Sequence, residues 1–161
     1  MGREDFLVAP CNRDAVGWID RWAEWPYPCL VLHGPVGSGK THLARVWQQH
    51  AGAVWDDGAG VGGHLRDAGQ PTSICLDING RVGDEAALFH LFNRTRERGG
   101  SLLITGRTPV RDWGIGLPDL LSRLLAAPAA SLAEPDDALL AAVTVKLFSD
   151  RQLAVTPDLL N

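Results

Sequence analysis

Short apolar runs and segments of helical periodicity alternate along this chain. An apolar run bounded by turn-forming residues predicts a buried strand, whereas apolar residues that recur every three or four positions predict a helix. The runs place strands at residues 29–32, 53–56, 73–77, 101–105 and 129–132. The periodic segments place helices at residues 13–24, from about 40 onward, and at 84–98, 117–125 and 135–149. Strands that alternate with helices indicate an α/β fold with a parallel sheet, here of five strands.

Several helix ends carry a local signal. Asn12 and Asp84 are predicted N-caps, because their side chains can accept hydrogen bonds from free amide groups of the first turn. Pro118 suits the first turn of the helix that it begins. The first helix is expected to hold Trp22 and Ala23 on its buried side.

A glycine-rich segment that fits the P-loop pattern G-x-x-x-x-G-K-[ST] lies between the first strand and the second helix. Its residues are Gly34, Pro35, Val36, Gly37, Ser38, Gly39, Lys40 and Thr41. Glycines let the backbone bring its N–H groups close to phosphate oxygens, and the helix that follows directs its positive end at the same anion. Lys40 would reach the β- and γ-phosphates, and the Thr41 hydroxyl would ligate Mg²⁺. The alternative is a glycine-rich turn that binds nothing, but the flanking strand and helix favour a nucleotide site.

The strand at residues 73–77 ends in a carboxylate, as a Walker B strand does. Asp77 is expected at the carboxyl end of a parallel strand beside the P-loop strand, where it would hold Mg²⁺ together with Thr41. The alternative is an ordinary strand end at which Asp77 opens a turn.

Composition narrows the class of protein. The 161 residues, 45% of them apolar, suffice for one globular domain. The net charge of −4 argues against a dedicated nucleic-acid-binding protein, because such proteins are usually basic. No apolar run is long enough to cross a membrane, and Phe6 excludes a myristoylation signal. The widely spaced Cys11, Cys29 and Cys75 fit reduced thiols better than a disulfide framework. We therefore expect a cytoplasmic protein without membrane association or sequence-specific DNA binding.

The motifs, taken in order, resemble those of AAA+ ATPases of the DnaA group, and in particular the Hda-type DnaA paralogues. The resemblance runs from about residue 6 to about residue 153. Besides the two Walker motifs, the segment 102–109 resembles the sensor 1 strand, with Thr105 at the sensing position. The segment 117–124 resembles the one that holds the family's arginine finger, and Arg123 falls on that finger. The Walker motifs are generic, so it is their combination with the 117–124 segment that makes the resemblance specific.

This resemblance implies an AAA+ three-layer sandwich that binds ATP or ADP with Mg²⁺ and regulates replication initiation. Residues 1–134 would form the nucleotide-binding core, and residues 135–161 would begin a helical lid that is largely missing. Such proteins work with the sliding clamp and promote hydrolysis of the ATP held by the DnaA initiator; assembly into a homo-oligomer stays open. A guanidinium such as that of Arg123, brought in from a neighbouring subunit, stabilises charge on the γ-phosphate. The alternative is a surface arginine that pairs with Asp119 one turn away.

The sequence departs from the DnaA group at several points. Ile78 stands where a second acid often orients the attacking water, so slow or no ATP hydrolysis by this chain alone is expected. The stretch 57–71 is too short for the DNA-contacting insertion of DnaA. The first glutamine is Gln48, so the N-terminal clamp-binding peptide of Hda-type proteins is absent or trimmed, which puts clamp binding in doubt.

Two other functions fit parts of the sequence. In a small-molecule P-loop kinase, Asp56 and Asp57 could hold a substrate hydroxyl, while Arg107 and Arg111 could close over phosphates. In a decayed nucleotide-binding scaffold, Ile78 and the missing lid would reflect a lost activity.

Overall fold

One parallel sheet of five strands organises the computed structural model, which describes residues 7–56, 73–78 and 82–150. The strands lie in the order β2-β3-β4-β1-β5. Their bounds are β1 (Cys29–His33), β2 (Val54–Asp56), β3 (Ser73–Asp77), β4 (Ser101–Gly106) and β5 (Ala129–Ser131). All four neighbouring pairs are parallel, which confirms the predicted α/β class and its five-stranded parallel sheet.

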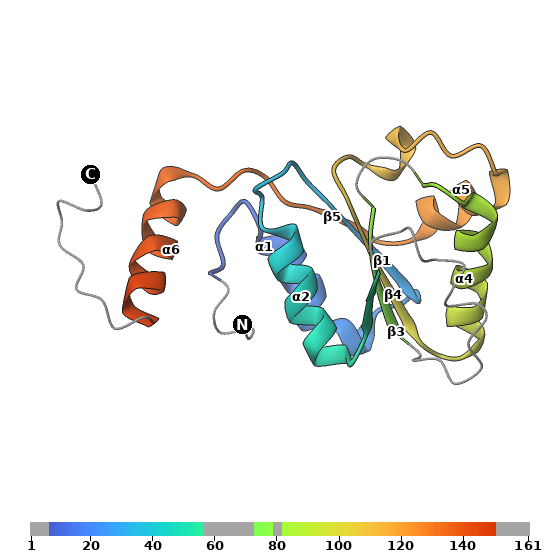
Figure 1. The fold of residues 1–161 in the computed structure, drawn as a ribbon, viewed down its shortest axis with the longest axis horizontal. Helices are drawn as coiled ribbons and strands as arrows, with labels where there is room; N and C mark the ends of the chain where they lie inside the picture. Colours follow the sequence, from blue (N-terminus) through green and yellow to red (C-terminus); the bar gives the residue numbers. More distant parts are fainter. Residues whose placement is uncertain (1–6, 57–72, 79–81, 151–161) are drawn as a thin grey trace.

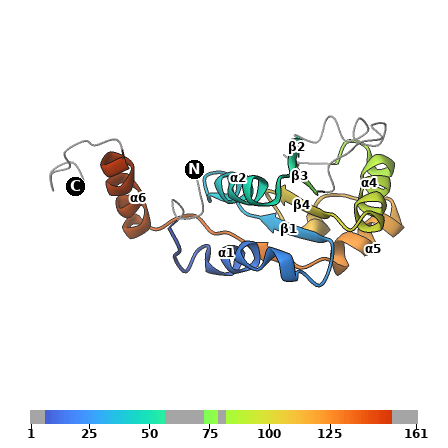
Figure 2. The ribbon, with the colours of Figure 1, turned by 90° about the horizontal axis from the view of Figure 1, so that it is seen from below.

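Helices cover both faces of the sheet and give the fold three layers (Figures 1 and 2). The helices α1 (Arg13–Asp20) and α2 (Lys40–Ala51) lie on one face, and α4 (Glu85–Glu97) and α5 (Pro118–Ala126) lie on the other. The short 3-10 turns η2 (Trp22–Glu24) and η3 (Val110–Asp112) follow α1 and β4. Helix α6 (Asp137–Asp150) stands apart from these layers in both views.

Alternation along the central strand divides the core in two. Leu30 and Leu32 of β1 face α1 and α2, whereas Cys29 and Val31 face α4 and α5, because successive side chains of a strand point to opposite faces. The α2 side contains Trp47, which is fully buried and stacks on Trp25 with ring centroids 5.7 Å apart. The strands are thus buried on both faces, which explains why they appear in the sequence as continuous apolar runs.

The order of the strands corrects one expectation. Strand β3, predicted to be the Walker B strand, does not lie beside β1, because β4 is inserted between them and pairs with both. Chain order does not determine neighbours in a parallel sheet, since each helical crossover can pass over a strand position. The carboxyl ends of β1, β4 and β3 nevertheless meet at one edge of the sheet.

The first helix begins at Arg13 after Asn12, as predicted, but its end and its cap differ from the prediction. Helix α1 ends at Asp20 and continues only as the separate turn η2, so Ala23 lies exposed rather than in the core. Asn12 precedes α1 but does not cap it with its side chain, since its Oδ1 accepts from Ala9 N and its Nδ2 donates to Leu7 O. This amide ties down the lead-in segment instead.

The other helix ends follow the predicted local rules. Asp84 caps α4 by accepting a 2.9 Å hydrogen bond from Ala87 N, and Gly99 adopts a φ of 69° just after that helix. Pro118 occupies the first turn of α5. The stretch 57–71, Asp57 and the segment 151–161 lie outside the described residues.

Helix α6 presents apolar side chains to solvent. Leu140, Val143, Val145 and Leu147 are exposed, with Leu140 half accessible. The division of the chain at residue 134 stays a prediction. No helix within the described part of the chain has the length and apolar character needed to span a membrane.

Candidate nucleotide-binding site

The P-loop connects β1 to α2 in the conformation that its glycines permit. Gly37 and Gly39 have φ values of 86° and 92°, a region that residues with a Cβ rarely adopt. Gly39 directly precedes α2, so the free amide groups of the first helical turn face the loop. Gly34 N donates a 3.1 Å hydrogen bond to Gly106 O, which joins the start of the loop to the end of β4.

Gly34 is required for a different reason. A Cβ at this position would overlap the backbone carbonyl oxygen of Leu132 and would lie 2.9 Å from Ser38 Oγ. The Ser38 side chain is itself buried, and its Oγ has no hydrogen-bond partner among the described residues. The first glycine therefore lets the loop pack against the segment that follows β5.

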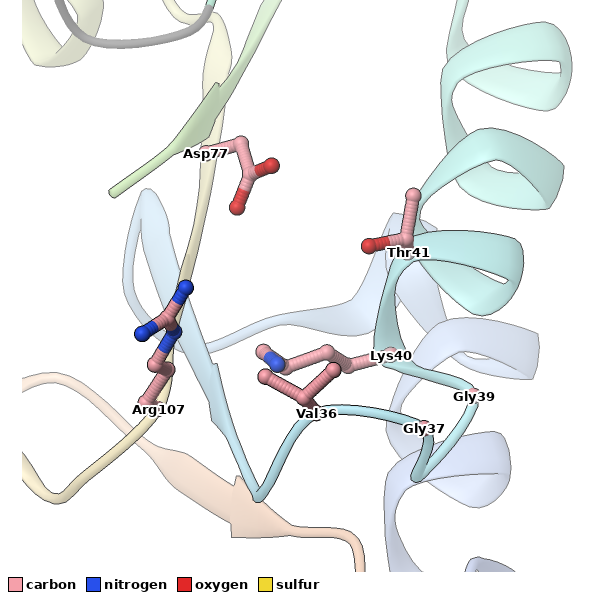
Figure 3. A pocket seen from close by; sticks show the side chains of 7 residues that line it. All are labelled: Val36, Gly37, Gly39, Lys40, Thr41, Asp77 and Arg107. Atoms are coloured by element: carbon pink, nitrogen blue, oxygen red, sulfur yellow. The ribbon is translucent and has the colours of Figure 1, made fainter. Parts of the chain in front are cut away.

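The predicted binding residues surround one pocket of about 450 Å³ at the carboxyl edge of the sheet. It is lined by Val36, Gly37, Gly39, Lys40, Thr41, Asp77 and Arg107 (Figure 3). The hydroxyl of Thr41, the ammonium of Lys40 and the carboxylate of Asp77 are directed into the same space. The other predicted binding residues also belong to the loop: Gly34 and Ser38 are buried, and Pro35 is exposed.

Lys40 is the most enclosed charged group of this pocket. Its side chain is only 7% exposed, and this burial lowers the pKa of the ammonium from its ordinary value. The Asp77 carboxylate opposes this shift of the pKa, whereas the nearby Arg107 guanidinium adds to it. A buried cation whose charge is only partly balanced is suited to binding an anion that enters the pocket.

Asp77 is held in place by the neighbouring strand. The two residues Asp77 and Thr105 are register partners in the β3–β4 pair, and Thr105 Oγ1 donates a 2.7 Å hydrogen bond to Asp77 Oδ1. Thr105 is fully buried and is not among the described residues that line the pocket. Thr105, at the predicted sensing position, is thus linked to the pocket indirectly, by its hydrogen bond to the carboxylate of Asp77.

The side chain of the residue after Asp77 is buried among apolar side chains. Ile78 is 4% exposed and packs in the apolar cluster on the α4 side, together with Val110 and Trp113. Its backbone N–H donates a 2.8 Å hydrogen bond to Thr105 O. This side chain supplies neither a proton acceptor nor a polar group that could orient water.

The donors around the pocket fit Mg²⁺ bound together with a nucleotide. The described residues contain no group of three or more His, Cys, Asp and Glu side chains that could hold a metal by themselves. Mg²⁺ is usually bound through one or two protein oxygens plus phosphate oxygens and water. Thr41 and Asp77 would hold the ion, and it would neutralise charge on the phosphates.

Arg123 lies at the opposite edge of the sheet. Its backbone oxygen accepts a 3.3 Å hydrogen bond from Tyr27 Oη, and Tyr27 precedes β1, whereas the P-loop follows β1. A strand of five residues spans roughly 16 Å, so the two ends are well separated. Within the described residues, the Arg123 side chain forms no ion pair with Asp119. The structure therefore does not bring Arg123 to the pocket of its own chain.

Arg107 is a pocket residue that the predicted binding set did not include. It comes directly after β4, and Figure 3 shows its guanidinium facing the space that Lys40 and Asp77 also face. In the sequence, the position of Arg107 immediately after the predicted sensor strand could have indicated that it lines the pocket. Of the residues named for a kinase, Arg107 lines the pocket, whereas Asp56 and Arg111 are not among the described residues that do so.

Comparisons with solved structures reveal the same fold in DNA replication initiators. The chain is similar to domain III of the Thermotoga maritima replication initiation protein DnaA, with a TM-score of 0.81 at 19% identity over 99% of this chain and 78% of that one. It is equally similar to a DNA replication initiation factor, with a TM-score of 0.81 at 17% identity. AMPPCP-bound DnaA from Aquifex aeolicus gives a TM-score of 0.78 at 17% identity.

These matches cover nearly all of this chain but a smaller share of the other proteins. Each covers 99% of this chain, but the chain spans 57% of the replication initiation factor and 58% of the Aquifex aeolicus protein. No protein-family model matches the chain. At this level of identity the likeness establishes the fold alone, which is that of domain III of DnaA.

Proposed function

We propose that this chain is a nucleotide-binding regulator of DNA replication initiation, similar in role to Hda. It would bind ATP or ADP with Mg²⁺ in its own pocket and present Arg123 to the ATP held by the DnaA initiator. The observation that carries the proposal is the convergence of Lys40, Thr41 and Asp77 on one pocket beside the P-loop. The fold shared with AMPPCP-bound DnaA supports adenine nucleotide as the ligand.

The location of Arg123 supports a role in trans. It lies at the amino edge of the sheet, whereas its own P-loop lies at the carboxyl edge. A guanidinium so placed would serve a nucleotide held by another subunit, and such arginines contribute about 10³ to 10⁵ in the rate of hydrolysis. The same edge carries a hollow of about 460 Å³, lined by residues that include Trp22, Tyr27 and Arg96. Aromatic residues and arginine are enriched where proteins contact partners, so this hollow would suit such a contact.

The core position of Ile78 favours one alternative, a nucleotide-binding scaffold without hydrolysis. Burial of Ile78 leaves no second acid beside Asp77, so we expect little ATP turnover by the chain alone. The regulator and the scaffold both bind nucleotide. They differ in whether Arg123 accelerates hydrolysis by a partner.

The test is phosphate release from ATP by the DnaA initiator of the same organism, with and without this chain. We expect the mixture to exceed the sum of its parts and the Arg123→Ala mixture to lose that excess. Arg98→Ala is the matched control, because Arg98 is an exposed arginine that follows α4 at the same edge of the sheet. Nucleotide affinity of the Arg123→Ala chain should be unchanged. A mixture that shows no excess would favour the scaffold. An excess that survives Arg123→Ala, or that Arg98→Ala also removes, would overturn the role of Arg123.

A further inference from the structure

The described residues that line the pocket carry more positive than negative charge. They include two cations, Lys40 and Arg107, but a single carboxylate, Asp77, which is already engaged by Thr105. Within the described residues, the Arg107 side chain has no hydrogen-bond or ion-pair partner. Two like charges that share a pocket repel each other, and this repulsion is one reason for the lowered pKa of Lys40. An anion bound between them would remove that repulsion.

The backbone on both sides of Arg107 is fixed. Gly106 pairs with His33 and accepts the hydrogen bond from Gly34 N, so the residue before Arg107 is joined to the P-loop. The residue after it, Thr108, accepts a 2.8 Å hydrogen bond from Trp113 Nε1 through its backbone oxygen. These contacts direct the loop that carries Arg107 toward the pocket.

The Trp113 ring also packs against Gly106. Trp113 is 2% exposed, and a Cβ at position 106 would lie 2.7 Å from its ring. The ring therefore occupies the space behind Gly106 while its Nε1 holds Thr108. Such support limits the positions available to Arg107, which lowers the entropy lost when its guanidinium binds a ligand.

We infer that Arg107 is a specificity-determining residue that binds the γ-phosphate in cis, so that the pocket discriminates nucleoside triphosphate from diphosphate. This inference rests on the proposed nucleotide binding. The P-loop and Lys40 line one side of the pocket, where the loop amides would hold the inner phosphates and Lys40 would reach the β- and γ-phosphates. Arg107 lines the other side with Asp77, where the terminal phosphate and its ion would extend. A guanidinium suits this position because it offers two parallel N–H groups to phosphate oxygens.

This role is distinct from that of Arg123. Arg107 belongs to the chain that holds the nucleotide, whereas Arg123 lies at the far edge of the sheet. A single copy of the chain would therefore distinguish ATP from ADP without a partner. The chain could then respond to whether it holds ATP or ADP before it forms any complex.

The test compares dissociation constants of Mg²⁺-ATP and Mg²⁺-ADP by calorimetric titration of the full chain. Arg107→Ala is expected to weaken ATP by about tenfold or more and ADP by less than about twofold, because only the bonds to the terminal phosphate are lost. Arg107→Lys should recover part of the ATP affinity. Arg111→Ala, an exposed arginine four residues further along, is the matched control and should leave both constants unchanged.

The outcomes separate this inference from the proposed function. A wild-type chain that binds neither nucleotide overturns both. A wild-type chain that binds nucleotide, with an Arg107→Ala variant whose ATP-to-ADP preference is unchanged, overturns the role of Arg107 alone. A selective loss of ATP affinity with an unaltered thermal unfolding midpoint supports it, because Arg107 is exposed and its removal leaves the core intact.

Discussion

Thr105 donates a 2.7 Å hydrogen bond from Oγ1 to Asp77 Oδ1 across neighbouring strands of the sheet. Thr105 is fully buried, while Asp77 reaches the pocket. The hydroxyl therefore orients one oxygen of the carboxylate and leaves the other free to face Thr41 and the P-loop. Thr105 would act on a nucleotide in this pocket through Asp77, and we therefore expect it to be a positioning residue.

Thr105→Val should weaken binding of Mg²⁺-nucleotide by about tenfold, since a hydrogen bond to a charged group contributes about 1.5–3 kcal/mol. Valine has nearly the shape of threonine but cannot hold the carboxylate in one orientation. The measurement is nucleotide affinity at several Mg²⁺ concentrations. We expect the loss to be largest at low Mg²⁺ and small in the absence of the ion.

Thr105→Ser is the matched control because it keeps the hydroxyl and removes only a methyl group. It should retain Mg²⁺-dependent binding while losing a little stability. If valine and serine weaken the binding equally, packing of the methyl group rather than orientation of Asp77 is what matters.

Gly34→Ala should destabilise the protein through a steric conflict rather than through backbone conformation. The added Cβ would overlap Leu132 O, a backbone atom that cannot turn away, and would crowd Ser38 Oγ. Overpacking of this kind costs about 1–3 kcal/mol, which urea denaturation would register as a lower midpoint. The same shift of the loop should reduce nucleotide affinity.

Gly83→Ala is the matched control for this change, because a Cβ there meets no atom within 4 Å. Its unfolding midpoint should match or slightly exceed that of the unmodified chain, because alanine lowers the entropy of the unfolded chain. An equal loss in both variants would contradict the assignment of the cost to the contact with Leu132.

Local chemistry allowed much of this fold to be predicted. The P-loop pattern is a continuous segment whose last two glycines, lysine and threonine line one pocket, so its spacing is visible in the sequence. Likewise, each strand is an apolar run because helices cover both of its faces. Asp84 and Pro118 act within a single turn, and both predictions at these positions are confirmed.

Contacts between segments that lie far apart in the sequence were harder to predict. The sequence did not reveal that β4 lies between β1 and β3, and therefore did not indicate that Thr105 would bond Asp77. Arg107 joins the pocket because its loop is joined to the P-loop through Gly106 and held by Trp113. These contacts depend on strand order and on the fold of η3, which spacing along the chain does not encode.

Ile78→Glu should lower stability without creating an ATPase. The new carboxylate would replace a side chain that is 4% exposed in an apolar cluster, and an uncompensated buried charge costs roughly 3–5 kcal/mol. Burial raises the pKa of such a group above its unfolded value of about 4.3, so the penalty should be absent below that pH and grow as the pH rises through it. Urea denaturation at pH 4 and pH 7 would measure this, with Ile78→Val as a control that loses only about 0.5–1.5 kcal/mol at either pH. If Ile78→Glu instead keeps its stability and gains ATP turnover, the side chain at position 78 can reach the pocket. The slow or absent hydrolysis that we expect of the unmodified chain would then depend on one residue rather than on the packing around it.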